Sequence, residues 1–135
     1  MKKRYFVSFI IVLLLFGCSN DDDFIQQIQL SGKTFDHLLF DTEQKCIDAQ
    51  PDPNFFINCH QEISFIDKTN ATIIFKDIVY PVTYRIDSNV ITINSDIEND
   101  GFLNSLVFEI ISSSSIRLLD NDTIWNERKG DSIWD

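Results

Sequence analysis

Residues 80–87 read Tyr-Pro-Val-Thr-Tyr-Arg-Ile-Asp. Every even position from 80 to 86 is apolar, whereas positions 83, 85 and 87 are polar. This period of two is that of a β-strand with one face in a core and the other face in solvent. A turn sequence, Asp87-Ser88-Asn89, follows it and leads into a second alternating run around Ile91 and Ile93. Working outward, we expect antiparallel hairpins on both sides.

The same alternation recurs along the rest of the chain, with short turn sequences between the runs. The expected strands are the end of 30–40, then 62–65, 72–76, 80–87, 91–94, 106–110, 116–118 and 123–128. Eight strands without a long helical period predict an all-β, antiparallel up-and-down meander. Such a meander removes its edges by closing into a barrel, and eight strands enclose a space that side chains fill or that holds one small ligand. A two-sheet sandwich is the alternative, although it needs longer crossovers.

Composition and charge exclude several classes of function. The 135 residues suffice for one domain, and a formal net charge of −10 argues against nucleic acid as a partner. His37 and His60 are the only histidines, and neither stands in a spacing typical of a catalytic triad or a Cys-His pair. We therefore expect a protein that is not an enzyme and that needs no cofactor.

The first seventeen residues have the composition of an export signal. Three basic residues precede residues 5–16, which are apolar apart from one serine. This run is shorter than the ~20 residues of a membrane-spanning helix and fits a secretory signal peptide. The junction Leu15-Phe16-Gly17-Cys18 resembles the lipobox of bacterial lipoproteins, in which the Cys becomes the first mature residue and carries acyl chains. We expect residues 1–17 to be removed and acylated Cys18 to hold the protein on a lipid bilayer; the alternative is an N-terminal anchor with an ordinary Cys.

Residues 18–27 are expected to be the lipidated Cys and a flexible acidic tether. The run Ser19-Asn20-Asp21-Asp22-Asp23 resembles the surface-export signal of Bacteroidota-type lipoproteins. This resemblance implies a lipid-anchored, surface-exposed protein of the outer membrane, with a periplasm-facing anchor as the alternative. Removal of residues 1–17 takes away three basic and no acidic residues, so the formal net charge changes from −10 to −13. Long-range repulsion then disfavours anionic ligands.

Two further cysteines, Cys46 and Cys59, flank a segment with two prolines. Outside the cytoplasm an even pair is typical of a disulfide, and a loop of this length is stabilised by about 3 kcal/mol in the chain-entropy model. A metal site built from Cys46, Cys59 and His60 is the alternative, but it lacks a CxxC pair and a fourth ligand. Free thiols are a further alternative. We predict the Cys46–Cys59 disulfide and no metal.

A family resemblance rests on the lipobox, on Leu30-Ser31-Gly32-Lys33-Thr34-Phe35, on the serial hairpins and on the closing Ile124-Trp125. Together these resemble the lipocalin-like lipoproteins of Bacteroidota. The resemblance implies a lipocalin-like barrel over residues 28–128, with a C-terminal tail at 129–135. It also implies a non-catalytic domain that binds a small apolar ligand or an envelope protein. The alternative is an accessory or inhibitor-type subunit of an envelope complex with a filled barrel and no ligand.

Four aromatic residues are the candidates for ligand binding. Tyr80 and Tyr84 share one strand face, where they either pack in the core or line a pocket. Phe55 and Phe56 lie in the stapled loop, and two adjacent side chains of a strand cannot both point inward. We expect this loop to cover the barrel mouth or to contact a partner. A filled interior would favour an interaction role, and an open apolar cavity would favour ligand binding.

Three short motifs resemble a calcium-binding loop or glycosylation sites. Asp96–Gly101 matches the first half of a Ca²⁺ loop, but the twelfth position is Val107, where a bidentate Glu is required. An ordinary acidic hairpin loop is therefore the favoured interpretation. Asp122-Thr123-Ile124 and Asp131-Ser132-Ile133 resemble a short O-glycosylation motif of exported Bacteroidota proteins, with a turn and a frayed terminus as the alternatives.

Overall fold

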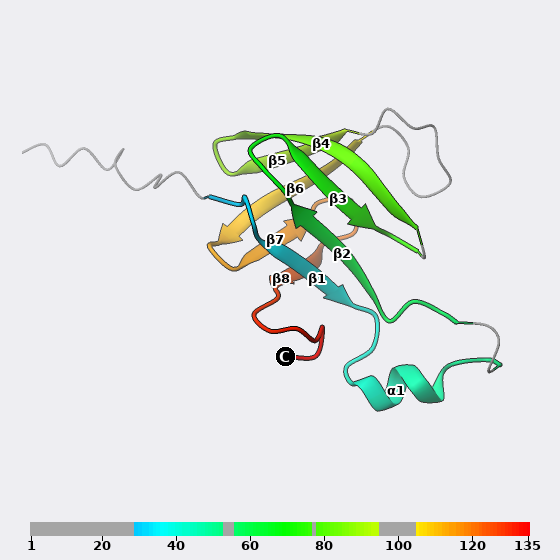
Figure 1. Ribbon diagram of the computed structural model, residues 1–135. Helices are drawn as coiled ribbons and strands as arrows, with labels where there is room; N and C mark the ends of the chain where they lie inside the picture. Colours follow the sequence, from blue (N-terminus) through cyan, green and yellow to red (C-terminus); the bar gives the residue numbers. More distant parts are fainter. Residues whose placement is uncertain (1–28, 53–55, 77, 95–104) are drawn as a thin grey trace, which may run out of the picture.

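The computed structural model describes residues 29–52, 56–76, 78–94 and 105–135 (Figure 1). These residues form eight strands and one short helix, α1 (Glu43–Asp48). The strands are β1 (Thr34–Leu38), β2 (His60–Phe65), β3 (Asn70–Ile74), β4 (Val79–Asp87), β5 (Val90–Asn94), β6 (Ser105–Ser112), β7 (Ser115–Leu118) and β8 (Thr123–Glu127).

Each strand pairs antiparallel with the next along the chain, and β8 pairs with β1 to close a barrel. The predicted eight-stranded up-and-down barrel is therefore confirmed, and the sandwich alternative is excluded. The helix α1 was not anticipated from the sequence. It lies within the connection between β1 and β2, outside the barrel wall (Figure 1).

Turn residues set the register of the hairpins. In the β4–β5 turn Ser88 has φ of 57°, and Asp122 before β8 has φ of 59°. Short polar side chains tolerate this left-handed region better than branched ones, because they bond to nearby backbone groups. The β4–β5 pairing then places Tyr84 opposite Ile93, so the alternating apolar faces of both strands meet on the same side of the sheet.

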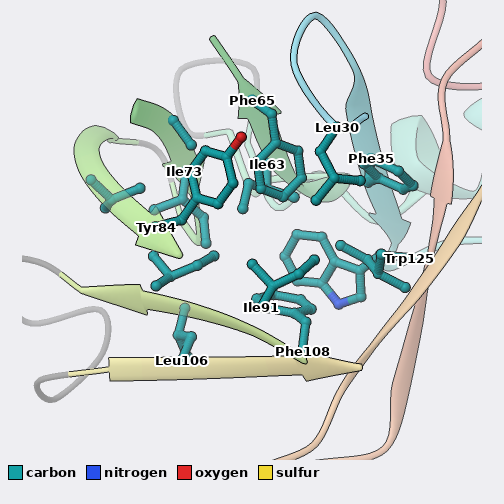
Figure 2. Close-up of a cluster of buried hydrophobic side chains, with 14 of the residues drawn as sticks. Leu30, Phe35, Ile63, Phe65, Ile73, Tyr84, Ile91, Leu106, Phe108 and Trp125 are labelled. Atoms are coloured by element: carbon teal, nitrogen blue, oxygen red, sulfur yellow. The ribbon is translucent and has the colours of Figure 1, made fainter. Parts of the chain in front are cut away.

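Side chains fill the interior of the barrel. Four large aromatic residues at its centre are almost completely buried: Phe35, Phe65, Phe108 and Trp125. The Trp125 ring meets the Phe108 ring edge-on with centroids 5.2 Å apart, and Phe65 meets Phe35 in the same way at 5.9 Å. Isoleucines from β2, β3, β5 and β7 occupy the space around these rings (Figure 2).

Alternating strand directions give the barrel two distinct ends. The connections β1–β2, β3–β4 and β7–β8 lie at one end, which we call the mouth end. The chain enters β1 at the opposite, N-terminal end, where Leu30 is buried in the core. Gly32 has φ of 81° in this entry turn, and its backbone N–H donates to the Phe65 carbonyl at 2.7 Å. A glycine suits this position because other residues rarely adopt such a φ.

Candidate functional site

The connection between β1 and β2 lies at the mouth end, and a disulfide and polar contacts hold its described residues together. Cys46, within α1, and Cys59 form the predicted disulfide, with Cα atoms 5.7 Å apart. This bond excludes the alternative in which both sulfurs ligate a metal. The Gln50 side chain accepts a hydrogen bond from the Ile57 N–H at 2.8 Å and donates to the Cys46 carbonyl at 3.0 Å. The two arms of the connection are thereby held together.

Both tyrosines of the predicted ligand site belong to the packed core. Tyr80 is 8% exposed and Tyr84 is 5% exposed. The Tyr84 hydroxyl donates to the Asp67 carbonyl, and its ring contacts the Phe65 ring at 4.8 Å. Burial, together with the nearby Asp67 charge, raises the pKa of the Tyr84 hydroxyl. Of the two environments considered for Tyr80 and Tyr84, the packed core and a pocket wall, the structure shows the packed core.

Exposed apolar side chains gather at the mouth end. Phe56 is 73% exposed, whereas Phe55 lies outside the described residues. Among the described residues eleven large apolar side chains are exposed, and the chain topology puts eight of them at this end. We call these eight the mouth-end apolar surface: Leu38, Leu39, Ile47, Phe56, Ile78, Val79, Leu119 and Ile124. Ile66, Ile86 and Ile111 lie toward the opposite end.

Acidic residues border this surface. Asp41, Asp48 and Asp52 are exposed in the β1–β2 connection, and Asp120 and Asp122 are exposed in the β7–β8 turn. Some of these charges are balanced locally, since Asp41 pairs with Lys45 and Asp122 with Arg117. Exposed ion pairs of this kind contribute little to stability, so a basic partner can replace Lys45 at Asp41 and Arg117 at Asp122 at low cost.

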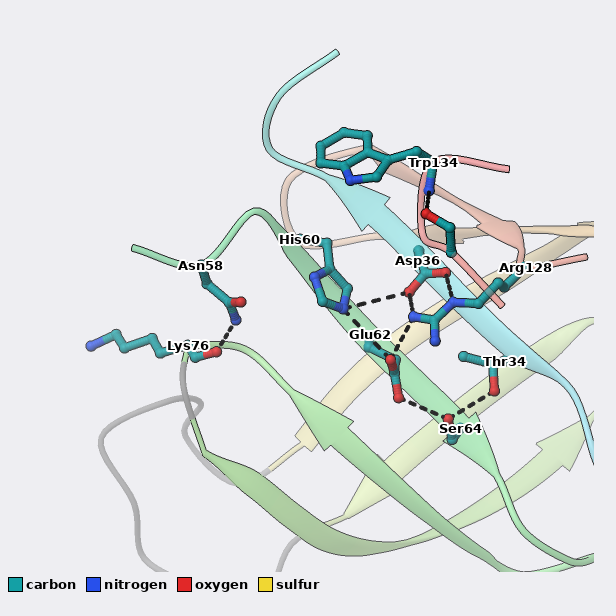
Figure 3. A network of polar contacts seen from close by, with 10 residues as sticks. Thr34, Asp36, Asn58, His60, Glu62, Ser64, Lys76, Arg128 and Trp134 are labelled. Atoms are coloured by element: carbon teal, nitrogen blue, oxygen red, sulfur yellow. Dashed lines mark hydrogen bonds and ion pairs between the residues drawn. The ribbon is translucent and has the colours of Figure 1, made fainter. Parts of the chain in front are cut away.

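A cluster of four charged or polar side chains lies on the outer face of β1 and β2: Asp36, His60, Glu62 and Arg128 (Figure 3). The Arg128 guanidinium donates to both carboxylate oxygens of Asp36, with Nε 2.7 Å from Oδ2, and to Glu62 Oε2 at 2.6 Å. His60 Nε2 lies 3.5 Å from Glu62 Oε2 and 3.9 Å from Asp36 Oδ1. Asp36 is only 6% exposed, and a bidentate Arg pair satisfies a carboxylate at such a site.

Electrostatics explain how this cluster tolerates burial. Burial alone would raise the pKa of the Glu62 carboxyl, but hydrogen bonds from Arg128, Ser64 and His60 outweigh it, so this pKa is lowered. The hydrogen bond to Asp36 is the main cause of a raised pKa for Arg128. Glu62 and Arg128 are therefore charged at neutral pH, and the Arg128 cation also holds the Asp36 side chain through two hydrogen bonds.

The cluster also has donor atoms of the kind that bind metals. One atom each of Asp36, His60 and Glu62 lies within 4.8 Å of the others. The Arg128 guanidinium, however, already contacts both carboxylates, and a divalent cation there would meet its positive charge. We therefore assign this cluster to an ion-pair network. Sequence reasoning missed it because Arg128 lies 92 residues from Asp36 along the chain and 66 from Glu62.

The C-terminal segment folds back onto the barrel wall. A hollow of about 320 Å³ lies between β1, β8 and this segment. Its walls include Leu38 and Ile124 from the strands and Ile133 and Trp134 from the C-terminal segment. The hollow is thus outside the barrel core, beside the Asp36–Arg128 pair.

The remaining motifs are located as follows. The Thr123 hydroxyl donates to Asn121 Oδ1 at 2.7 Å and accepts from Trp125 Nε1 at 3.2 Å, while Ser132 Oγ accepts from the Trp134 N–H. Cys18 and the partial Ca²⁺ loop at 96–101 lie outside the described residues. Within the described part of the chain, no helix is both long and apolar enough to cross a membrane. Comparisons with protein-family models, curated proteins and solved structures found no match to this chain.

Proposed function

We propose that this chain is a lipid-anchored, non-catalytic binding module of the bacterial cell envelope, and that it holds a protein partner at its mouth end. One observation carries the proposal: side chains fill the barrel interior, while eight of the eleven exposed large apolar side chains in the described part of the chain lie at one end. Contiguous exposed apolar residues with a polar border are typical of protein–protein interaction sites.

The filled interior favours a protein over a small ligand inside the barrel. Ligand pockets are commonly concave spaces of roughly 300–1,000 Å³ lined by apolar side chains. Here the four central aromatic rings form two edge-on pairs in the same buried cluster as the isoleucines, and each is at most 1% exposed. A ligand inside the barrel would have to displace these rings, at a cost of several kcal/mol in lost packing.

The partner's chemistry follows from the border of the surface. Exposed aspartates lie in the same two connections as several of these apolar residues, and the predicted mature chain carries a formal charge of −13. An apolar protein face bordered by Lys or Arg complements this arrangement and excludes acidic partners by repulsion. Binding without catalysis also agrees with the contacts of the histidines, since His37 bonds to a backbone carbonyl and His60 contacts the ion-pair network.

The position of the predicted anchor supports the same function. Cys18 precedes β1, and the described chain enters β1 at the N-terminal end of the barrel. An acylated Cys18 would therefore tether the barrel through that end. The flexible segment expected at 18–27 leaves the mouth end accessible to other proteins of the envelope.

Site-specific photo-crosslinking in the native envelope tests the proposal. A photoreactive phenylalanine analogue replaces Phe56 or Ile78 at the mouth end, and Ile66 or Ile111 at the other end as matched controls. We expect a discrete protein adduct from the first two positions and none from the controls. Equal adducts at all four positions, or adducts from the controls alone, would refute the proposed surface.

A further inference from the structure

The seam between β1 and β8 is paired over a short length. The Arg128 N–H donates to the Thr34 carbonyl at 2.8 Å, and the paired residues are Phe35 with Glu127 and Asp36 with Asn126. Continuing this antiparallel register would place Leu38 opposite Ile124. The observed register stops at Asp36 and Asn126, before it reaches the mouth end.

Main-chain groups face this seam beyond the last pair. Alternate residues of a strand direct their N–H and C=O to the same side. Because the Arg128 N–H donates to Thr34, the backbone N–H and C=O groups of even-numbered residues in β8 point toward β1. Those of odd-numbered residues point toward β7, as the bond from the Glu127 N–H to the Ser114 carbonyl shows. On the other side of the seam, the Leu39 N–H donates to the Cys59 carbonyl, just before β2. The N–H and C=O of the preceding residue, Leu38, therefore point the opposite way, toward β8.

A side chain replaces the missing ladder bond. His37 Nδ1–H donates to the Ile124 carbonyl at 3.0 Å, which is the acceptor that Leu38 N–H would otherwise use. The remaining edges of both strands are fully engaged, with β2 pairing all five residues of β1 and β7 pairing residues 123–126 of β8. Pairing is therefore lost only between β1 and β8, beyond Asp36 and Asn126, and we call this unpaired stretch the parted seam.

The hollow of about 320 Å³ lies at this parting. Leu38 is 37% exposed and Ile124 is 41% exposed, and both belong to the mouth-end apolar surface. Ile133 and Trp134 form the third wall. Main-chain polar groups beside an apolar hollow are the combination that strand addition uses, in which backbone bonds give affinity and pockets for alternate side chains give specificity.

From this geometry we infer that the parted β1–β8 seam accepts an extended segment of the protein partner as an added strand. This inference rests on the proposed function and specifies how the partner binds. The segment pairs with the backbone of both Leu38 and Ile124 and places an apolar side chain against Ile133 and Trp134. Asp135 is an exposed carboxylate in the wall of this hollow, and Asp122 is exposed two residues before Ile124, so both favour a segment with flanking lysines.

Hydrogen exchange on the purified chain tests the seam directly. The probe is the extended peptide Lys-Val-Thr-Val-Thr-Val-Lys, and its control carries Pro in place of the central Val and so lacks one backbone donor. We expect the first peptide to slow exchange of the Leu38 and Ile124 amides by at least about tenfold at saturation. The proline peptide should bind at least about tenfold more weakly, a difference of about 1.4 kcal/mol.

A variant removes the seam donor from the protein itself. Ile124→Pro deletes the N–H that faces β1 and leaves the pairing with β7, while Ile124→Val retains the donor. We expect peptide binding to be lost with Ile124→Pro and kept with Ile124→Val. If the proline variant does not fold, the effect of the peptide on amide exchange at Leu38 and Ile124 in the wild-type chain still tests whether the seam binds the peptide.

The outcomes separate the two proposals. Unchanged exchange at both amides, or equal binding of the two peptides, overturns the seam inference. Adducts at Phe56 and Ile78 in the envelope would in that case leave the mouth-end surface standing. Loss of those adducts as well overturns both proposals.

Discussion

Asp67 shows how one exposed carboxylate can fix a turn. Its Oδ1 accepts hydrogen bonds from the Thr69 and Asn70 N–H groups, each at 2.8 Å, and its Oδ2 accepts from the Asn70 side chain. These bonds favour the charged form and lower the pKa of Asp67 to about 2 from an ordinary value of 3.8. The carboxylate therefore orders the β2–β3 turn as long as it is ionised.

This pKa predicts the sign of a pH effect on stability. Since the pKa is lower in the folded state, the stabilisation is present above the ordinary value of 3.8 and is lost as the pH falls through about 2. Asp67→Ala should lower the free energy of unfolding at pH 5 and should flatten its dependence on pH between about 4 and 2. Urea unfolding of both proteins across this range measures the effect. Parallel pH profiles would contradict the assignment.

At the scale of single residues, the sequence predicted the core better than the polar contacts. Residues at alternating apolar positions, such as Ile63, Tyr84 and Phe108, are buried as their period of two predicts. The Asp36–Glu62–Arg128 network could not be predicted, because it depends on the register that brings β1, β2 and the end of β8 together. Alternation indicates which face a residue occupies, but it does not indicate which residue lies across from it.

At the scale of elements, the eight strands were predictable and α1 was not. The strands carry a sustained apolar alternation, whereas α1 has six residues and no apolar period long enough to indicate a helix. Thr42 caps it by accepting from the Lys45 N–H at 3.3 Å, and the disulfide ties it to the start of β2. Local capping and a cross-link therefore stabilise a helix too short to form alone.

The disulfide yields a prediction at this scale. Its removal in Cys46→Ala/Cys59→Ala frees the unfolded chain and should cost about 3 kcal/mol of stability in the chain-entropy model. Equilibrium unfolding in urea measures this cost against the oxidised wild type. Reduced wild type serves as the control for the alanine side chains, because it breaks the same bond without changing the sequence. A loss below about 0.5 kcal/mol would show that the cross-link does not constrain the unfolded chain.

The β1–β8 seam belongs to the same scale. Sequence alternation predicts that β1 and β8 are strands, but it does not predict that they pair only as far as Asp36 and Asn126, or that the His37 ring bonds to the Ile124 carbonyl beyond that point. A histidine in a strand gives no signal of this in sequence alone. The candidate site for an added strand therefore emerged only from the hydrogen bonds.

For the whole molecule, the predicted lipid anchor determines where the barrel acts. Cys18→Ala removes the acylation site and should release the protein from membranes or leave the signal peptide uncleaved, because the acyl chains supply most of the membrane affinity. Metabolic labelling with a palmitate analogue, followed by membrane fractionation, measures both effects. Equal labelling of the wild type and the variant would contradict lipidation at Cys18.

A filled barrel that binds a protein at its mouth end should keep that protein bound after gentle extraction from the envelope. Native mass spectrometry of the detergent-solubilised protein from its own envelope tests this claim most directly, with Ile47→Ser/Phe56→Ser as the mouth-end variant and Ile66→Ser/Ile111→Ser as the matched control. We predict a bound species of protein mass that is retained by the wild type and the control and is lost from the mouth-end variant. A retained small apolar molecule with no bound protein, or equal retention in all three samples, would contradict the account.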